Sequence, residues 1–123
     1  MVSMQLIGGK KVSDKLLNDI SKIQIAVAKT MVTSSLLMEN EVKASIAGHK
    51  DEQTSVDTGN FLRSVHAKNT DTEATAQSNV HYGVYLEYGT TKINPRRHFL
   101  NSSKRLKPKI LKLYIDNISA AVK

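Results

Sequence analysis

The chain has 123 residues, with 18 Lys and Arg against 11 Asp and Glu, four His and no Cys. This length suits one domain spanning residues 1–123, and the absence of Cys excludes disulfides, thiolate metal sites and a cysteine nucleophile. Apolar runs all fall short of the ~20 residues that a membrane-spanning helix needs, and residues 1–9 lack the hydrophobic stretch of a signal peptide. We therefore expect a soluble domain made in a cytoplasm.

The positive charge is concentrated near the end of the chain. Residues 92–123 hold nine basic side chains and one acid, a balance of +8, whereas residues 1–91 hold nine basic and ten acidic side chains, a balance of −1. This division indicates either a surface that binds a polyanion or a helix whose charged side chains face water.

The first half of the chain predicts a short arm and a long helix. Met4 to Ile7 are mostly apolar and are stopped by a pair of glycines, which favours a strand or an arm over residues 1–12. Ser13 offers an N-cap and Asp14 a first-turn acid. Apolar residues then recur at helical steps, so we expect a helix over residues 13–47.

The expected length of this helix leaves two possibilities. About 35 residues would span ~50 Å, whereas a compact chain of this size has a radius of gyration near ~14 Å. Either the helix breaks near Thr33–Ser35, where weak helix formers gather, or its exposed end packs on another subunit.

The second half predicts a hairpin and further helices. Residues 48–60 are polar and are expected to form a loop, and residues 61–80 a β-hairpin whose turn lies at 69–71. A short helix over 81–88 should end at Gly89. A last helix over 100–121 should carry Pro108 in its first turn or at a kink. This order predicts an α+β fold, in which a long N-terminal helix and a C-terminal helix pack on a small antiparallel sheet.

Catalytic and metal-binding patterns are absent from the sequence. The four histidines, at positions 49, 66, 81 and 98, have no ligand spacing, and the chain has no nucleophile-elbow, P-loop or dinucleotide motif. Asp57 and Glu87 are the best carboxylate pair, but nothing brings them together for acid–base catalysis. We expect no enzymatic activity, no metal and no cofactor.

Aromatic residues are unusually clustered. Four of the six lie between Tyr82 and Phe99. Tyr82 and Tyr85 are expected either in the core or at a subunit interface, with stacking on nucleic acid as a third possibility. Separately, Asp57-Thr58-Gly59-Asn60 predicts a cap-and-turn at the entry to the hairpin.

The basic segment provides the candidate contacts to DNA or to an acidic partner. The residues are Lys92, Arg96, Arg97, Lys104, Arg105, Lys107, Lys109 and Lys112. At helical spacing 105, 109 and 112 share one side and 104 and 107 another, so a solvated helix face remains the alternative.

Two segments together resemble one family. Residues 56–65 read VDTGNFLRSV, residues 80–90 read VHYGVYLEYGT, and residues 98–100 read HFL. In this order they resemble the D-T-G-x-L-x-x-S-I, Y-A-x-Y-V-E-F-G-T and P-F-L motifs of the tail-completion, or head–tail joining, proteins of long-tailed double-stranded DNA phages. The resemblance covers about residues 55–105. The chain departs from the pattern at Phe61 for Leu, Gly83 for Ala and His98 for Pro.

The resemblance implies a non-enzymatic structural protein of the virion neck. It implies a ring, a hexamer, between the head connector or stopper protein and the tail terminator or tail tube, assembled in the host cytoplasm. The residues that carry the resemblance, as structural or interface positions, are Asp57, Thr58, Gly59, Phe61, Leu62, Tyr82, Tyr85, Glu87, Gly89, Thr90 and Phe99. Glu87 would accept hydrogen bonds from the loop amides after it or pair with an arginine. The alternatives are a tail terminator ring and a small basic nucleic-acid-binding protein.

Overall fold

The fold is built along one long helix, α1. The structure, a computed structural model, describes residues 3–5, 9–56 and 59–123. Its elements are α1 (Gly9–Ile46), α2 (Asn60–Ser64), β1 (His66–Asn69), β2 (Ala74–Gln77), α3 (Gly83–Tyr88) and α4 (His98–Ala121). The predicted α+β class is confirmed, with a long N-terminal helix, a C-terminal helix and a two-stranded antiparallel sheet in a mostly helical chain.

Helix α1 starts earlier than predicted and is unbroken. Because it begins at Gly9, Ser13 lies inside the helix and is not its N-cap. Ser3–Gln5 form neither helix nor strand, and Leu6 and Ile7 of the expected strand lie outside the described residues. The stretch of weak helix formers stays helical because it is packed against the rest of the chain, with Ser34 and Ser35 each 2% exposed. The hydroxyls of Thr33 and Ser35 bond back to the carbonyls of Lys29 and Val32, at 3.2 Å and 2.8 Å.

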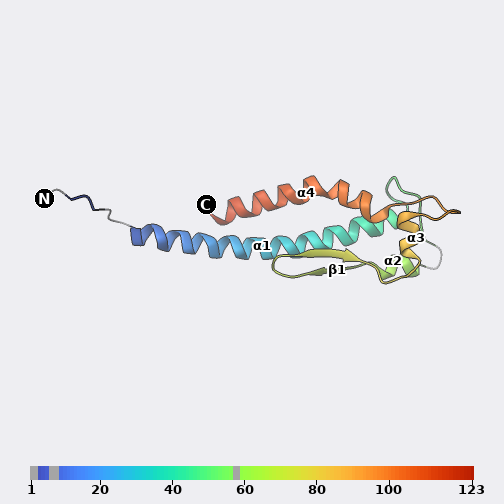
Figure 1. Cartoon of the computed structure of the whole chain (residues 1–123), viewed down its shortest axis with the longest axis horizontal. Helices are drawn as coiled ribbons and strands as arrows, with labels where there is room; N and C mark the ends of the chain where they lie inside the picture. Colours follow the sequence, from blue (N-terminus) through green and yellow to red (C-terminus); the bar gives the residue numbers. More distant parts are fainter. Residues whose placement is uncertain (1–2, 6–8, 57–58) are drawn as a thin grey trace.

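Helix α1 lies between α4 and the hairpin (Figure 1). On the α4 side, Asn117 Nδ2 donates to Thr30 Oγ1 at 2.8 Å. On the hairpin side, the backbone amide of Ala67 donates to Glu39 Oε2 at 3.1 Å. Both layers therefore depend on α1 for their placement.

The hairpin is shorter than the predicted 61–80 segment. Its strands pair His66 with Gln77 at one end and Asn69 with Ala74 at the other. Residues 60–64 form the short helix α2 instead of a strand, and its buried residue Phe61 enters the core. The physical reason is that Phe61 and Val65 lie one helical turn apart, which lets both apolar side chains face the same core.

The hydrophobic core lies at the C-terminal end of α1. Its buried centre consists of Val42, Ile46, Phe61 and Val65, with Leu62, Val80, Leu86 and Phe99 packed against it. The N-terminal part of α1 extends well beyond this core and beyond the end of α4 (Figure 1). At 1.5 Å per residue the 38 residues of α1 span about 57 Å, against about 36 Å for the 24 residues of α4.

Pro108 lies in the interior of α4, not in its first turn, because α4 begins ten residues earlier at His98. Proline has no N–H to donate to the carbonyl of Lys104, and its ring crowds that carbonyl. Among the described residues, no helix is both long enough and apolar enough to cross a membrane.

We expect Pro108→Ala to raise the free energy of unfolding by about 1–2 kcal/mol. The substitution restores one helical hydrogen bond and removes the ring clash, and a more flexible unfolded chain offsets part of the gain. Urea unfolding followed by circular dichroism measures the change. Lys107→Ala, at the exposed neighbouring position, is the control and should change stability by less than ~0.5 kcal/mol. A destabilised Pro108→Ala variant would contradict this account of α4.

Candidate functional site

The residues that carry the family resemblance lie largely at one end of the molecule, where α2, α3 and the start of α4 meet (Figure 1). Three of them, Phe61, Glu87 and Phe99, line an open groove of about 620 Å³, together with Gly83. Asp57 and Thr58 lie outside the described residues. Gly59, which precedes α2, has a φ of 82°, so the predicted turn leads into a short helix and not directly into the hairpin.

Glu87 binds the first turn of α4. Its Oε2 accepts the backbone amide of Phe99 at 3.0 Å, and its Oε1 accepts that of Leu100 at 2.8 Å. These amides have no partner within the helix, and a carboxylate also interacts favourably with the positive end of the helix dipole. We expected Glu87 to accept hydrogen bonds from the loop that follows it, but the amides belong to α4. A side chain of α3 therefore caps the N-terminus of α4.

Gly89 and Thr90 shape the connection between these helices. Gly89 has a φ of 80°, and a Cβ there would lie 2.8 Å from the Pro95 ring, so no other residue fits without movement. Thr90 Oγ1 accepts the amides of Lys92 at 3.2 Å and Ile93 at 3.1 Å. The two motif residues thus fold the loop back so that Glu87 reaches α4.

Phe61 and Gly83 are in close contact. A Cβ on Gly83 would lie 3.1 Å from Phe61 Cε1, which is tighter than ordinary van der Waals contact. Two of the three departures from the family pattern, the larger Phe61 and the smaller Gly83, are therefore adjacent in space and compensate in volume. The sequence does not indicate that these two departures are related, because 22 positions separate the residues.

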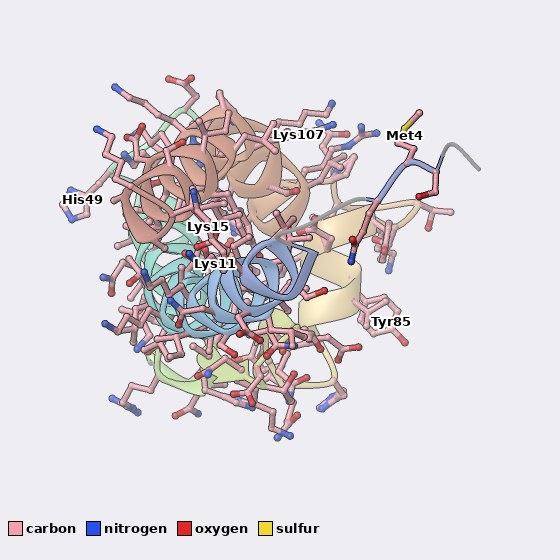
Figure 2. The ribbon with its side chains drawn as sticks, turned by 90° about the vertical axis from the view of Figure 1, so that its left-hand side faces the viewer. Met4, Lys11, Lys15, His49, Tyr85 and Lys107 are labelled. Carbon is pink, nitrogen blue, oxygen red and sulfur yellow. The ribbon has the colours of Figure 1, made fainter. Side chains whose placement is uncertain are left out.

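The tyrosines do not fill the core of this chain. The exposed fractions of Tyr82, Tyr85 and Tyr88 are 37%, 54% and 78%, and α3 has no buried residue. Tyr85 projects from the edge of the molecule (Figure 2), and Tyr82 contacts Phe61 edge-on with ring centroids 6.0 Å apart. Of the two placements expected for Tyr82 and Tyr85, a position in the core is wrong, because Leu86 is the residue of α3 that packs against the core.

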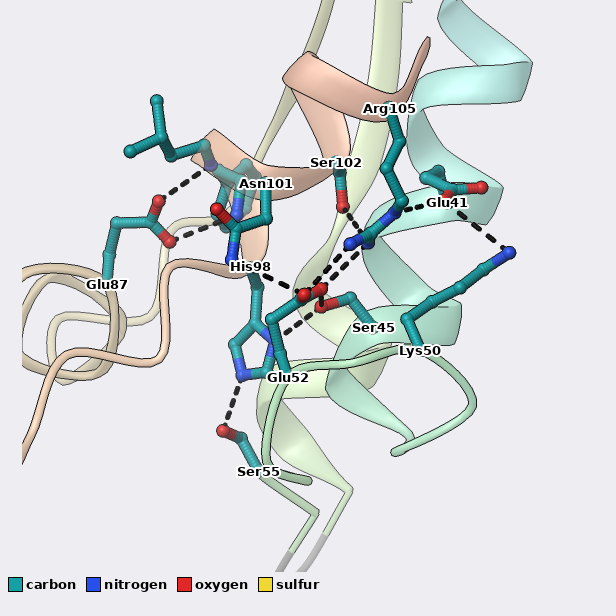
Figure 3. A network of polar contacts seen from close by, with 12 residues as sticks. Glu41, Ser45, Lys50, Glu52, Ser55, Glu87, His98, Asn101, Ser102 and Arg105 are labelled. Atoms are coloured by element: carbon teal, nitrogen blue, oxygen red, sulfur yellow. Dashed lines mark hydrogen bonds and ion pairs between the residues drawn. The ribbon is translucent and has the colours of Figure 1, made fainter.

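A buried histidine connects three segments next to the groove (Figure 3). His98 is 0% exposed. Its Nδ1 lies 2.7 Å from Ser45 Oγ on α1, and its Nε2 lies 2.6 Å from Ser55 Oγ in the loop that follows α1. No pattern in the sequence distinguishes this histidine from the other three, because its partners lie 43 and 53 residues away in the chain.

The partners of the two serines are satisfied by one tautomer of His98. Ser45 donates its hydroxyl proton to Glu52 Oε1, so its oxygen accepts from His98 Nδ1–H. Ser55 Oγ accepts from Arg96 at 2.8 Å and keeps its own proton available for His98 Nε2. All these bonds hold together when the imidazole is neutral. Burial lowers the pKa of His98 below its usual value, against the opposing effect of Glu87 and Glu52.

Arg105 joins α4 to α1 and to the loop beside His98. It binds Glu52 with both terminal nitrogens, at 2.8 Å and 2.7 Å, and its Nε donates to Glu41 Oε1 at 2.7 Å. The hydrogen bonds from Arg105 lower the pKa of Glu52 to about 2, and those from Glu52 raise the pKa of Arg105. A two-pronged ion pair of this kind is strong because its geometry is fixed.

This arrangement corrects the predicted set of partner contacts. Arg105 is engaged with two glutamates, and Arg96 donates to Ser55 Oγ and to the Thr54 carbonyl, each at 2.8 Å. Both guanidinium groups bind groups of the same chain. For Arg105 the reason is that position 105 lies on the side of α4 that faces α1. The other six candidates are exposed: Lys92, Arg97, Lys104, Lys107, Lys109 and Lys112.

Among the described residues, no group of three or more His, Asp or Glu side chains is placed to hold a metal ion. No family model, curated protein or solved structure matches the chain in comparisons with known proteins.

We expect Phe61→Leu and Gly83→Ala to be coupled in a double-mutant cycle. Gly83→Ala alone forces its new Cβ against the Phe61 ring, whereas Leu at position 61 makes room for it. The double variant should be more stable than the sum of the single effects predicts, by about 0.5–2 kcal/mol. Urea unfolding measures this coupling. Phe61→Leu combined with Thr72→Ala, in the exposed hairpin turn, is the control cycle and should be additive.

We expect stability to fall as the pH drops below about 6.5, because burial makes His98 harder to protonate in the folded chain than in the unfolded one. The loss is at most ~1.4 kcal/mol per pH unit for one proton. Glu52 adds a second loss between its usual pKa of 4.5 and its folded value of about 2. Urea unfolding at pH 8, 7, 6 and 5 measures the first effect.

His98→Gln should remove this dependence between pH 7 and 5, while being less stable than the unmodified chain at pH 8. His49→Gln replaces an exposed histidine and should leave the dependence unchanged. An unchanged slope in His98→Gln would contradict the assignment of the effect to His98.

Proposed function

We propose that this chain is a structural, non-enzymatic protein of the neck of a long-tailed double-stranded DNA phage. It forms a ring of identical copies, a hexamer, that joins the tail to the head connector and so completes the tail. Its partners are further copies of itself, the head connector or stopper protein, and the tail terminator or tail tube protein. It is assembled in the host cytoplasm and remains in the virion.

The observation that carries this proposal is the contact between Phe61 and Gly83. These are two positions at which the chain departs from the family motifs. A Cβ on Gly83 would lie 3.1 Å from Phe61 Cε1, which is a steric reason for the two departures to occur together. A chance match to two short motifs gives no reason for such compensation. Glu87 and Gly89, which agree with the motif, have exacting roles in the same place.

Exposed apolar surface favours assembly. Tyr85 and Tyr88 expose 54% and 78% of their surface. Tyrosine side chains supply large contact areas at protein–protein interfaces. Val84, next to them on α3, is also 58% exposed. One face of α3 is therefore better suited to a neighbouring protein than to water.

The nucleic-acid-binding alternative loses two of its candidate residues, since Arg96 and Arg105 bind groups within the chain. The six exposed basic side chains suit non-specific contact with DNA that passes through the ring. A tail terminator remains the alternative within the same class of protein, because it too forms a ring.

The proposal is tested by deleting the gene from a phage that carries it. Filled heads and finished tails should accumulate separately, and wild-type protein supplied from a plasmid should restore joined, infectious particles. Electron microscopy and plaque counts measure both. Because a terminator caps the tube, tails of uncontrolled length would instead favour that alternative.

Tyr85→Glu should restore far fewer joined particles than wild type, whereas His49→Gln, which alters an exposed residue of the loop after α1, should restore them fully. Normal, infectious particles formed without the gene would overturn the proposal.

A further inference from the structure

One edge of the hairpin, that of β2, is left open by the described residues of the chain. The amide of Thr70 donates to the carbonyl of Glu73 at 2.8 Å, so hydrogen-bonded pairs alternate along the two strands from that pair. Ala74 and Ala76 then occupy non-hydrogen-bonded positions, with their amides and carbonyls directed away from β1. The amide of Ala67, which points away from β2 in the same way, binds a glutamate of α1. The backbone groups of Ala74 and Ala76 have no such partner among the described residues.

This open edge of β2 is a place where another strand can add. Residues 74–77 read ATAQ and contain no charged residue and no proline, which are the residues that commonly keep an exposed edge from pairing. An extended peptide beside β2 would satisfy the amides and carbonyls of Ala74 and Ala76. Every second side chain of that peptide would point to the same face as these two alanines.

Two cavities lie next to this edge, between β2, α1 and α4. The first has a volume of about 260 Å³, and its lining includes apolar side chains of α1 and α4 and one alanine of β2: Met38, Val42, Leu106, Ile110 and Ala76. The second has a volume of about 380 Å³, and its lining includes residues of the same three elements: Met31, Ser34, Met38, Ala74, Ile110 and Tyr114. Ala76 and Ala74, two positions apart on β2, thus each border one cavity.

A buried hydroxyl at the larger cavity lacks a partner. Ser34 is 2% exposed, and its Oγ has no hydrogen-bond partner among the described residues. The hydroxyl of Tyr114, which lines the same cavity, reaches the sulfur of Met31 at 3.3 Å, and a thioether is a weak acceptor. Because buried polar atoms are normally hydrogen-bonded, this cavity is suited to a peptide, which brings polar backbone groups as well as apolar side chains.

The arm before α1 has the pattern of such a strand. Residues 2–6 read VSMQL, in which apolar and polar side chains alternate with the period of a strand that has one apolar face. Residues 3–5 are among those that the structure describes, and Met4 exposes 99% of its surface, so this large side chain has almost no contact within its own chain. Residues 1–8 carry no charged side chain, and of the described side chains that line the two cavities only Glu73 is charged.

The arm cannot reach the two cavities of its own chain. Met31, at the end of the larger cavity nearest to the start of α1, lies 22 positions after Gly9, which is about 33 Å along the helix. Met4 lies five positions before Gly9, so even a fully extended backbone carries it at most about 18 Å from that residue. An arm that occupies these cavities must therefore come from another copy.

We propose that residues 2–6 of one copy of this chain add to the edge of β2 in the next copy as an antiparallel third strand. Met4 lies opposite Ala76 and enters the smaller cavity, and Leu6 lies opposite Ala74 and enters the larger one. The backbone of the arm bonds the open edge. In this direction the arm leaves the edge beyond the hairpin turn, whereas a parallel arm would run toward the segment that leads to α3.

The contact joins two different surfaces. Each copy supplies one arm and one open edge, so the association can repeat from copy to copy and close into a ring. The inference rests on the proposed function for this biological setting, and it names a contact that would hold neighbouring copies of the ring together.

Disulfide cross-linking tests the contact, because the chain has no native cysteine. In the proposed register Gln5 lies opposite Thr75, which is exposed, and both side chains are on the face of the sheet opposite to Met4 and Ala76. Full-length Gln5→Cys and Thr75→Cys proteins are mixed at about 100 µM and oxidised. We expect a dimer linked between positions 5 and 75, identified by mass spectrometry, because facing residues of paired strands are within the ~7 Å between Cα atoms that a disulfide requires.

Lys68→Cys is the matched control for Thr75→Cys. Lys68 is exposed and pairs with Thr75 on the same face of the hairpin, but it lies one strand further from the arm. With neighbouring strands about 4.8 Å apart, position 68 is about 10 Å from position 5, beyond the reach of a disulfide. The yield of the 5–75 dimer should exceed that of the 5–68 dimer at least tenfold, and equal yields would overturn the inference.

The alternation along the arm gives a second test. Met4→Asp added to the Gln5→Cys protein should lower the yield of the 5–75 dimer at least tenfold, because it places a charge in an apolar cavity. Ser3→Asp places the same charge on the opposite face of the arm and should lower the yield less than threefold. Equal losses from the two variants would refute the proposed strand.

A chain that carries both Gln5→Cys and Thr75→Cys tests whether the arm comes from another copy. It should form a ladder of linked species after oxidation. A product linked within one chain would contradict the inference, because the arm would then reach its own hairpin.

These results can be told apart from a failure of the proposed function. A 5–75 link together with normal particles after gene deletion would support the contact and reject the neck role. Failed joining after deletion, without a 5–75 link, would support the neck role and reject the contact.

Discussion

The two-pronged ion pair between Arg105 and Glu52, in which the glutamate is buried and the arginine partly exposed, is the contact on which the arrangement of α4 depends. It fixes α4 against the C-terminal end of α1, and the same glutamate accepts the hydroxyl of Ser45, which orients His98. Removal of Arg105 would leave the Glu52 carboxylate, whose side chain is 3% exposed, without its charged partner, which is costly in a site that excludes water. The start of α4 is thus held by His98 and Arg105 from inside and by Glu87 from α3.

The contacts that hold the start of α4 give the molecule two unlike ends. At one end, α2, α3 and the beginning of α4 surround the core residues Ile46 and Phe61. At the other, α1 continues without a partner and exposes Leu16 and Ile20. A chain that concentrates its core at one end and leaves apolar helix at the other is suited to assembly with neighbours, because those side chains are buried only when a second molecule covers them.

The motif residues act through backbone geometry and packing. Gly89 accepts a conformation that other residues disfavour, Glu87 satisfies amides of another helix, and Gly83 makes room for Phe61. Each depends on a residue distant in sequence, so the motifs describe one small tertiary unit. The exposed tyrosines belong to α3, which is part of this unit, and the unit positions them at the surface.

The sequence by itself determined the elements governed by local physics. The apolar periodicity of α1 and α4, the turn between the strands, and Gly89 after α3 follow from interactions within a few residues. The α+β class followed from their order. The sequence also indicated that an unbroken α1 would outreach its own domain, since length is a property of the helix alone.

Only the tertiary structure decided which side chains meet. The sequence did not predict that residues 60–64 form a helix or that Arg105 faces Glu41 and Glu52, and it left open whether Tyr85 is in the core or exposed. It also missed the His98 network, whose members come from three separate segments. The physical reason is that burial and pairing depend on how distant segments pack, and no local pattern encodes the energy of that packing.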